Sequence, residues 1–339
     1  GKGGSQMMAY PTLFFDYDKD DQRRDVSVCN YGIVLSAKGN KYQMNTYNGM
    51  GVGKYRINWK KEMGATNSKR NINFPLLRYA DVLLMYAEAL NEVNNGPTQE
   101  AINAVKEVRK RAFRGNEAKA AAGIPTNHDD FLTFIQKERK LELSNEGLRR
   151  TDLTRWGKQY EMLMAAKQRL IDLAKRDGEF ANVPVYRAYY LSTTPKFEDP
   201  TIALSYIDLS QAEVENLGLK ADQISGLKVL NSSSAGKGSV TADLYEKDGK
   251  MYSEGNKAEG AGTQTYTILN MFSIVSIKQK GNLCVEDVTG VSSNNTWITG
   301  NSGVFYGLQK NMTELMPFNT SKILDVNAGL EGQQHPAYK

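Results

Sequence analysis

Glutamates at helical spacing are the first candidates for chemistry in this 339-residue chain. Glu138, Glu142 and Glu146 follow one another at intervals of four, which would align three carboxylates on one face of a helix. Aligned carboxylates bind metal ions in helical bundles, and paired ones cleave glycosidic bonds in hydrolases. A di-iron site also needs Glu-x-x-His, and no histidine follows any of the three glutamates at that spacing. The pattern therefore favours a structural role in which nearby arginines, Arg139, Arg149, Arg150 and Arg155, neutralise the carboxylates.

The apolar stretch NFPLLRYADVLLMYAEALNE keeps three charges, Arg78, Asp81 and Glu88. Arg78 and Asp81 are spaced i,i+3, so they can pair on one helix face. Buried charges persist only when they are paired, so we expect a narrow polar stripe meeting opposite charges on a neighbouring helix. The expected structural network comprises Arg78, Asp81, Glu88, Glu138, Arg139, Glu142, Glu146, Arg149, Asp152 and Arg155.

A third acidic pattern lies near the start, where Asp16, Asp18 and Asp20 alternate as in a calcium-binding loop. Such a loop needs glycine at its sixth position and glutamate at its twelfth, and this chain has Asp21 and Ser27 there. We favour a solvated turn and keep calcium as the alternative. No metal site is expected elsewhere.

The sequence offers few candidate residues for nucleophilic catalysis. The chain has two histidines and two cysteines, Cys29 and Cys284, and it lacks a Gly-x-Ser-x-Gly elbow. Two cysteines exclude a disulfide scaffold and a four-thiolate zinc site, and whether they meet stays open. We therefore expect a protein that is not an enzyme and carries no cofactor.

Aromatic residues in loop-like stretches are the candidates for ligand binding. Flat rings beside Asn and Arg can stack on sugar faces, although such rings also fill the core of a loop-rich domain. The candidate ligand-binding residues are Tyr47, Trp59, Tyr186, Tyr189, Tyr190 and Trp297.

Composition places the chain among globular proteins. It is 40% apolar and 24% charged with a formal charge of +5, and no basic run predicts a nucleic-acid partner. No apolar run approaches the ~20 residues that cross a bilayer. The opening Gly1-Lys2-Gly3-Gly4-Ser5 indicates an internal start rather than a signal peptide.

The elements that would position these residues are mainly helices. Apolar periodicity predicts helix over 73–114, with Pro75 in the first turn, a break at 94–97 and Thr98 as a cap. A second helical stretch begins at a cap, Asn127, and ends at Gly178. Residues 10–60 predict short strands and turns, and the region beyond 180 predicts short strands with a hairpin at EKDGK.

The predicted fold is mainly α, with stacked tetratricopeptide-like helix pairs and an irregular, loop-rich C-terminal region containing short β-strands. The expected divisions are residues 1–72, strands and turns that pack on the helices; 73–178, the helical region; and 179–339, the irregular region.

The same residues resemble those of a known family. The stretch from Asn73 looks like the signature helix of the SusD/RagB nutrient-binding lipoproteins, and FLTFIQKERKLELSNEGLRRTDLTRWG is similar to the family's next block. Asp21-Gln22-Arg23-Arg24-Asp25 resembles its Asp-Pro-Arg turn, with Gln22 in place of proline. The ending, LMPFNTSKILDVNAGLEGQQHPAY, resembles the family terminus, although His335 and Ala337 depart from it.

The resemblance implies a protein on the outer face of the outer membrane that captures oligosaccharides for a SusC-like TonB-dependent transporter. It also implies an N-terminal half and a lipid anchor that this chain does not contain. The alternative is a peptide-binding or protein–protein scaffold of tetratricopeptide type, and a hydrolase using Glu138 ranks below both.

Overall fold

The computed structural model describes the chain in separate stretches. These are residues 9–34, 41–55, 74–191, 204–228, 239–248, 250–252, 262–272, 305 and 308–310. Trp59, Trp297, Cys284 and the C-terminal block at 315–338 lie outside the described residues. The chain falls into two compact units, residues 1–147 with 182–276 and residues 148–181 with 277–339.

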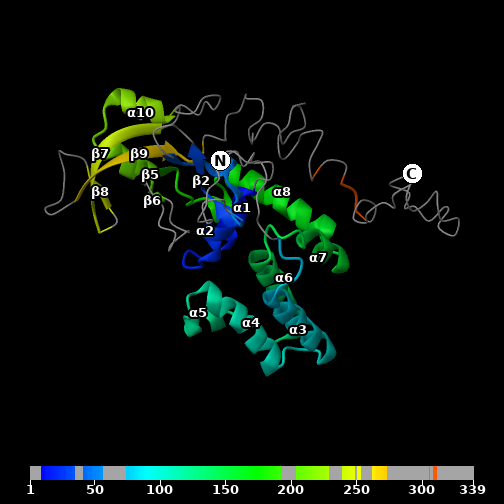
Figure 1. Ribbon diagram of the computed structural model, residues 1–339. Helices are drawn as coiled ribbons and strands as arrows, with labels where there is room; N and C mark the ends of the chain where they lie inside the picture. The colour runs from blue at the N-terminus through cyan, green and yellow to red at the C-terminus, as the bar shows by residue number, and fades with distance from the viewer. Residues whose placement is uncertain are drawn as a thin grey trace. The chain divides into compact units, whose positions relative to one another are not determined.

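Packed helices form one part of the first unit (Figure 1). They are α3 (Tyr79–Val93), α4 (Gln99–Ala112), the short α5 (Glu117–Ala121) and α6 (His128–Glu142). Leu84 of α3, Val105 of α4 and Ile135 of α6 are fully buried in one shared core. This packing confirms the expectation of a mainly helical chain with packed helix pairs.

Two helix starts are capped as the sequence predicts. Thr98 accepts a hydrogen bond from the backbone N–H of Ala101 at 3.2 Å, which caps α4. Asn127 accepts one from the N–H of Asp130 at 3.0 Å, which caps α6. Each cap satisfies an N–H group that the first turn leaves without a helical partner.

The predicted start of α3 is wrong. Pro75 is not in its first turn, because the helix begins at Tyr79 and Arg78 before it is extended, with φ −143° and ψ 160°. Arg78 bonds to carboxylates of α6 and of the loop after it, as described below, and these contacts hold it in that conformation. As a result, Leu76 and Leu77 lie outside the helix and are exposed.

The N-terminal part of this unit contains the expected short strands. β1 (Val28–Cys29) pairs with β4 (Gly51–Val52), β2 (Tyr31–Val34) pairs with β3 (Lys41–Met44), and η1 (Tyr47–Gly49) lies between β3 and β4. It also contains two helices that we did not predict, α1 (Pro11–Asp16) and α2 (Arg23–Ser27). Helices this short depend on tertiary contacts, so periodicity gives little sign of them.

A five-stranded antiparallel sheet forms the rest of the first unit. Its order is β6 (Leu204–Leu209), β5 (Tyr186–Leu191), β9 (Gly262–Asn270), β7 (Ser239–Lys247), β8 (Lys250–Tyr252). The pairing of Lys247 with Lys250 confirms the hairpin expected at EKDGK. Two short helices, α9 (Gln211–Glu215) and α10 (Ala221–Lys228), supply apolar residues to the sheet's core.

The helical elements described in the second unit are α7 (Arg149–Arg155), α8 (Gln159–Lys175) and the single turn η3 (Gly178–Phe180). The residue that ends α8 is not Gly178, as predicted, but Arg176, which takes the left-handed conformation at φ 55°. Across the described residues of both units, no helix is long and apolar enough to cross a membrane.

Candidate functional site

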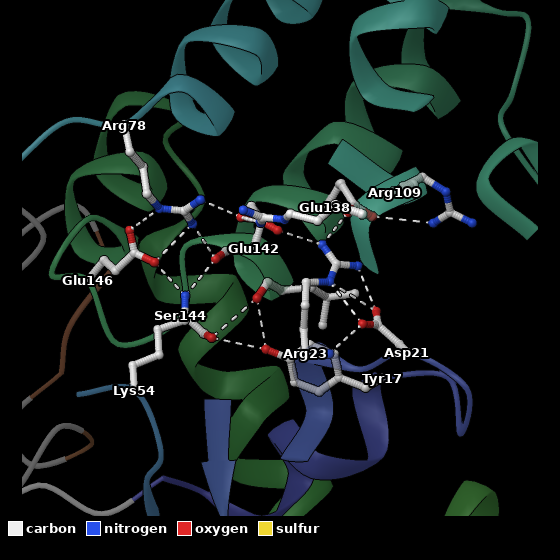
Figure 2. Close-up of polar contacts among 12 residues, drawn as sticks. Tyr17, Asp21, Arg23, Lys54, Arg78, Arg109, Glu138, Glu142, Ser144 and Glu146 are labelled. Carbon is white, nitrogen blue, oxygen red and sulfur yellow. Dashed lines mark hydrogen bonds and ion pairs between the residues drawn. The ribbon is translucent and has the colours of Figure 1, made fainter. Parts of the chain in front are cut away.

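A cluster of charged residues, most of them buried or half-buried, lies among α2, α4, α6 and the segment before α3 (Figure 2). We call it the charge network. Its members are Asp21, Arg23, Lys54, Arg78, Arg109, Arg111, Glu138, Glu142 and Glu146. All of them belong to the first unit.

Glu142 has the most cationic partners of the three glutamates. It is 2% exposed, and its carboxylate accepts from Arg23 at 3.1 Å and also from Arg78 and Arg111. Burial raises the pKa of Glu142, but the three arginines outweigh burial, so its pKa lies below the usual value. The carboxylate is therefore held ionised and fully engaged.

Arg23 joins the N-terminal segment to α6. Its Nη1 atom lies 2.5 Å from Oε1 of Glu138, and its Nη2 and Nε atoms lie 2.6 and 3.0 Å from the carboxylate of Asp21. Burial lowers the pKa of Arg23, but the negative charges of Glu138 and Asp21 raise it by more than burial lowers it. The net shift of the Arg23 pKa is therefore upward. Arg109 of α4 reaches the other oxygen of Glu138 at 3.3 Å.

Glu146 does not continue the helical row of glutamates. α6 ends at Glu142, and Asn145 and Gly147, at φ 64° and 82°, turn the chain in the left-handed region. The turn brings Glu146 to Arg78, whose Nε lies 2.7 Å from Oε2, and to Lys54. The same carboxylate is thus bound by two cations that are distant in the sequence.

Lys54 is a half-buried cation of this network. Its ammonium donates to the backbone oxygen of Glu142 at 2.7 Å and to the carboxylate of Glu146. Burial lowers its pKa, and Glu146 offsets only part of that effect.

The remaining predicted charges occupy other places. Asp81 and Arg139, both buried, bond to each other at 2.7 Å, so Asp81 meets α6 rather than Arg78, which lies just before α3. Glu88 is half-buried on α3. In the second unit, Arg155 bonds to Asp152 at 3.0 Å within α7 and stacks on Trp156, as does Arg149.

Most of the cations that bond to the glutamates were not predicted, because the prediction considered only residues close to the glutamates in the sequence. Arg23, Lys54, Arg109 and Arg111 come from three separate segments. The signal for Arg23 was its place in the Asp-Gln-Arg-Arg-Asp turn, whereas the others carried no signal because helical spacing reports only neighbours within one element.

The alternating aspartates do not converge on a common point. Asp16 pairs with Lys140, and Asp18 and Asp20 pair with Lys119. Within the described stretches, no group of three or more His, Cys, Asp or Glu could hold a metal ion. The thiol of Cys29 donates to the backbone oxygen of Tyr31 at 3.2 Å.

Most of the described aromatic candidates lie inside the protein. Tyr47, Tyr186 and Tyr189 are 0%, 3% and 4% exposed, and Tyr190 is half-buried with its ring 5.8 Å from that of Tyr266. Burial favours the alternative interpretation, core packing, for the first three. A ligand-binding role for Trp59, Tyr190 and Trp297 stays a prediction.

Comparison with known proteins identifies the family to which the chain belongs. The model of the SusD family matches residues 6–218, which is more than half of the chain. The chain belongs to the SusD family. SusD-like protein P2 of Formosa agariphila is 31% identical over 162 residues, covering 46% of this chain and 32% of that protein. SusD-like protein P38 of the same organism is 34% identical over 110 residues, covering 32% of this chain and 22% of that one.

One solved structure is also similar, the crystal structure of a SusD homolog from Bacteroides thetaiotaomicron. It is 32% identical, with a TM-score of 0.40, over 48% of this chain and 35% of that chain. The SusD-family chain described here therefore spans about a third or less of these relatives.

The SusD-family match contains the entire charge network, from Asp21 to Glu146. Members of this family are binding proteins rather than enzymes. The ionised and fully engaged state of Glu142 is consistent with that class, because a general acid needs a carboxyl group that can carry a proton near neutral pH.

Proposed function

We propose that this chain is part of a surface-exposed nutrient-binding protein that captures oligosaccharides and passes them to a SusC-like TonB-dependent transporter. The observation that carries the proposal is the SusD-family match over residues 6–218. The similarity to two SusD-like proteins supports it. Within the proposal, the whole protein sits on the extracellular face of the outer membrane through a lipid anchor.

In this proposal, the role of the charge network is to stabilise the fold that carries the binding site. Arg23 bonds the N-terminal segment to Glu138 and Glu142 of α6. These bonds fix the positions of the two elements, and therefore of the ends of the loops that join them. Arg78 and Lys54 extend these contacts to the start of α3 and the end of β4. A binding protein needs such a rigid base because ordering a loose site on binding costs free energy.

In this proposal, aromatic rings make the contacts with the sugar. Trp59, Trp297 and the half-buried Tyr190 are the candidates for stacking on a pyranose face. The buried Tyr47, Tyr186 and Tyr189 would support the site from within the core.

The proposal is tested by titrating the purified chain with a panel of oligosaccharides, read by calorimetry and tryptophan fluorescence. Saturable binding to one glycan class, lost in Trp59→Ala or Trp297→Ala, is the expected result. Trp156→Phe is the matched control, because the ring of Trp156 is contacted by Arg149 and Arg155 of α7 in the second unit. Saturable binding that survives loss of both candidate tryptophans would remove them from the site.

A peptide-binding or scaffold role is the second candidate. The observation that favours it is the set of large apolar residues left exposed on and before α3. Peptides included in the same panel separate the two functions, since a scaffold would bind peptide and show no affinity for any sugar.

A further inference from the structure

His128 lies where the end of α3 meets the start of α6. It is the first residue of α6, and its backbone oxygen accepts a hydrogen bond at 3.1 Å from the side-chain amide of Asn91, a buried residue in the last turn of α3. Its ring lies between two carboxylates. Nε2 is 3.2 Å from Oε1 of Glu92, and Nδ1 is 2.7 Å from Oδ1 of Asp129. One carboxylate belongs to α3 and the other to α6, so the ring connects the two helices.

The two contacts of the ring require a proton on each nitrogen. An ionised carboxylate accepts hydrogen bonds and donates none. A neutral imidazole has a single N–H, so it can donate to only one of the two carboxylates, whereas the imidazolium can donate to both at once. The arrangement around His128 is therefore complete only when the ring is charged.

The surroundings of the ring favour the charged form. The hydrogen bonds and negative charges of Asp129 and Glu92 outweigh the opposing effect of partial burial, so the pKa of His128 lies above its ordinary value of 6.5. These two carboxylates are the charges that act most strongly on the ring. Asp130, the next acidic residue of α6, is bonded to Asn127 instead. The C-terminal end of α3 also favours a cation, whereas the N-terminal end of α6 disfavours one.

We propose that His128 is a proton-dependent clasp between α3 and α6, which bonds to both carboxylates when the ring is charged and loses one of the two bonds when it is neutral. The bond from Asn91 involves no titrating group, so it persists in either state. The clasp therefore adjusts how firmly the end of α3 is held and does not release it. The inference goes beyond the proposed glycan binding and does not depend on it, since it uses no residue of that site.

The direction of the pKa shift gives the sign of the pH dependence. A group whose folded pKa is raised contributes stability that is fully present below its unfolded pKa, here 6.5, and is lost as the pH rises through the folded pKa. The junction of α3 and α6 should therefore be most stable in mildly acidic solution. Because the His128 side chain is 25% exposed, water screens its pairs, and the effect should be smaller than that of the buried glutamates.

A pH titration followed by NMR of the histidine rings tests the clasp directly. The chain has two histidines, and His335→Gln leaves His128 as the single imidazole to follow. Its pKa should lie above 6.5 and should fall in both Glu92→Gln and Asp129→Asn, which keep a hydrogen-bond acceptor and remove the charge. Asp130→Asn is the matched control, because it removes a neighbouring charge that is bonded elsewhere, and it should lower the pKa less.

Urea unfolding provides a second measurement. The parent should exceed His128→Gln in free energy of unfolding by more at about pH 5.5 than at about pH 9, where the ring is neutral in both the folded and the unfolded chain. A His128 pKa at or below 6.5 would overturn the proposal, as would a pKa that falls in only one of the two carboxylate variants. A stability difference that is equal at the two pH values would also overturn it.

Discussion

The Nη1 atom of Arg23 lies 3.1 Å from Oε2 of Glu142, although 119 positions separate the two residues. Both side chains are almost completely buried, and the same guanidinium bonds to Glu138 and Asp21. A buried charge that loses its partner keeps its desolvation cost, so this contact makes both partners sensitive to truncation.

Replacing Glu142 should destabilise the fold. Glu142→Ala removes a buried carboxylate that Arg23, Arg78 and Arg111 share, and breaking a buried ion pair costs ~3–5 kcal/mol. Urea unfolding followed by circular dichroism measures the loss. Glu107→Ala, at an exposed position of α4, is the control and should change the free energy of unfolding very little. A Glu142→Ala protein as stable as its parent would refute the structural role of the network.

Stability should fall with pH because of the same residue. The folded pKa of Glu142 lies below its ordinary value of 4.5, so its contribution is present above that pH and is lost as pH falls through the folded pKa. Urea titrations between pH 7 and pH 3 should show a smaller decline for Glu142→Gln than for the parent. Parallel curves for the two proteins would mean that Glu142 does not contribute to acid unfolding.

The bond between Asp81 and Arg139 should appear as coupling in a double-mutant cycle. Each single change, Asp81→Ala or Arg139→Ala, leaves a buried charge, whereas the double change removes both. The interaction free energy should be ~0.5–3 kcal/mol. The exposed pair Lys110 and Glu117 serves as the reference cycle and should show weaker coupling, because water screens it. Additive single changes at Asp81 and Arg139 would contradict the pairing.

Tyr47 should behave as a core residue. Its hydroxyl donates to the backbone oxygen of Pro184 at 3.1 Å, and its ring contacts Phe15 and Phe272. Tyr47→Phe keeps the ring and removes one hydrogen bond, so it should cost ~1 kcal/mol of stability. Affinity for any glycan found by titration should stay that of the parent; a selective loss of affinity without loss of stability would place Tyr47 in the ligand site.

The sequence was most informative where the physics is local. Caps at Thr98 and Asn127 depend on residues within one turn, and both were predicted correctly. The turn at Lys247–Lys250 is local in the same way. The start of α3 was misplaced because contacts of Arg78 with carboxylates more than sixty positions away hold it in extended backbone.

The candidate sites show the same division. Carboxylate spacing correctly identified Glu138 and Glu142 as a pair on α6, but spacing cannot report that Arg23 and Arg111 approach from other elements. For the aromatic candidates, the residue type is the same whether the ring packs in the core or binds a ligand, so the sequence does not distinguish the two roles. Burial separates them only in the structure, as it does for Tyr186 and Tyr189.

The long reach of Arg23 also bears on how the chain is made. Its bonds to Glu138 and Glu142 span 115 and 119 positions, so Arg23 leaves the ribosome well before its partners are synthesised. Closing a loop of that size costs chain entropy before any contact repays it, which slows folding. Until α6 emerges, Asp21 two residues away is the near partner for the guanidinium. Docking of the N-terminal segment onto α6 is therefore a late step, and a nascent chain stalled before residue 138 would expose α2 to proteases.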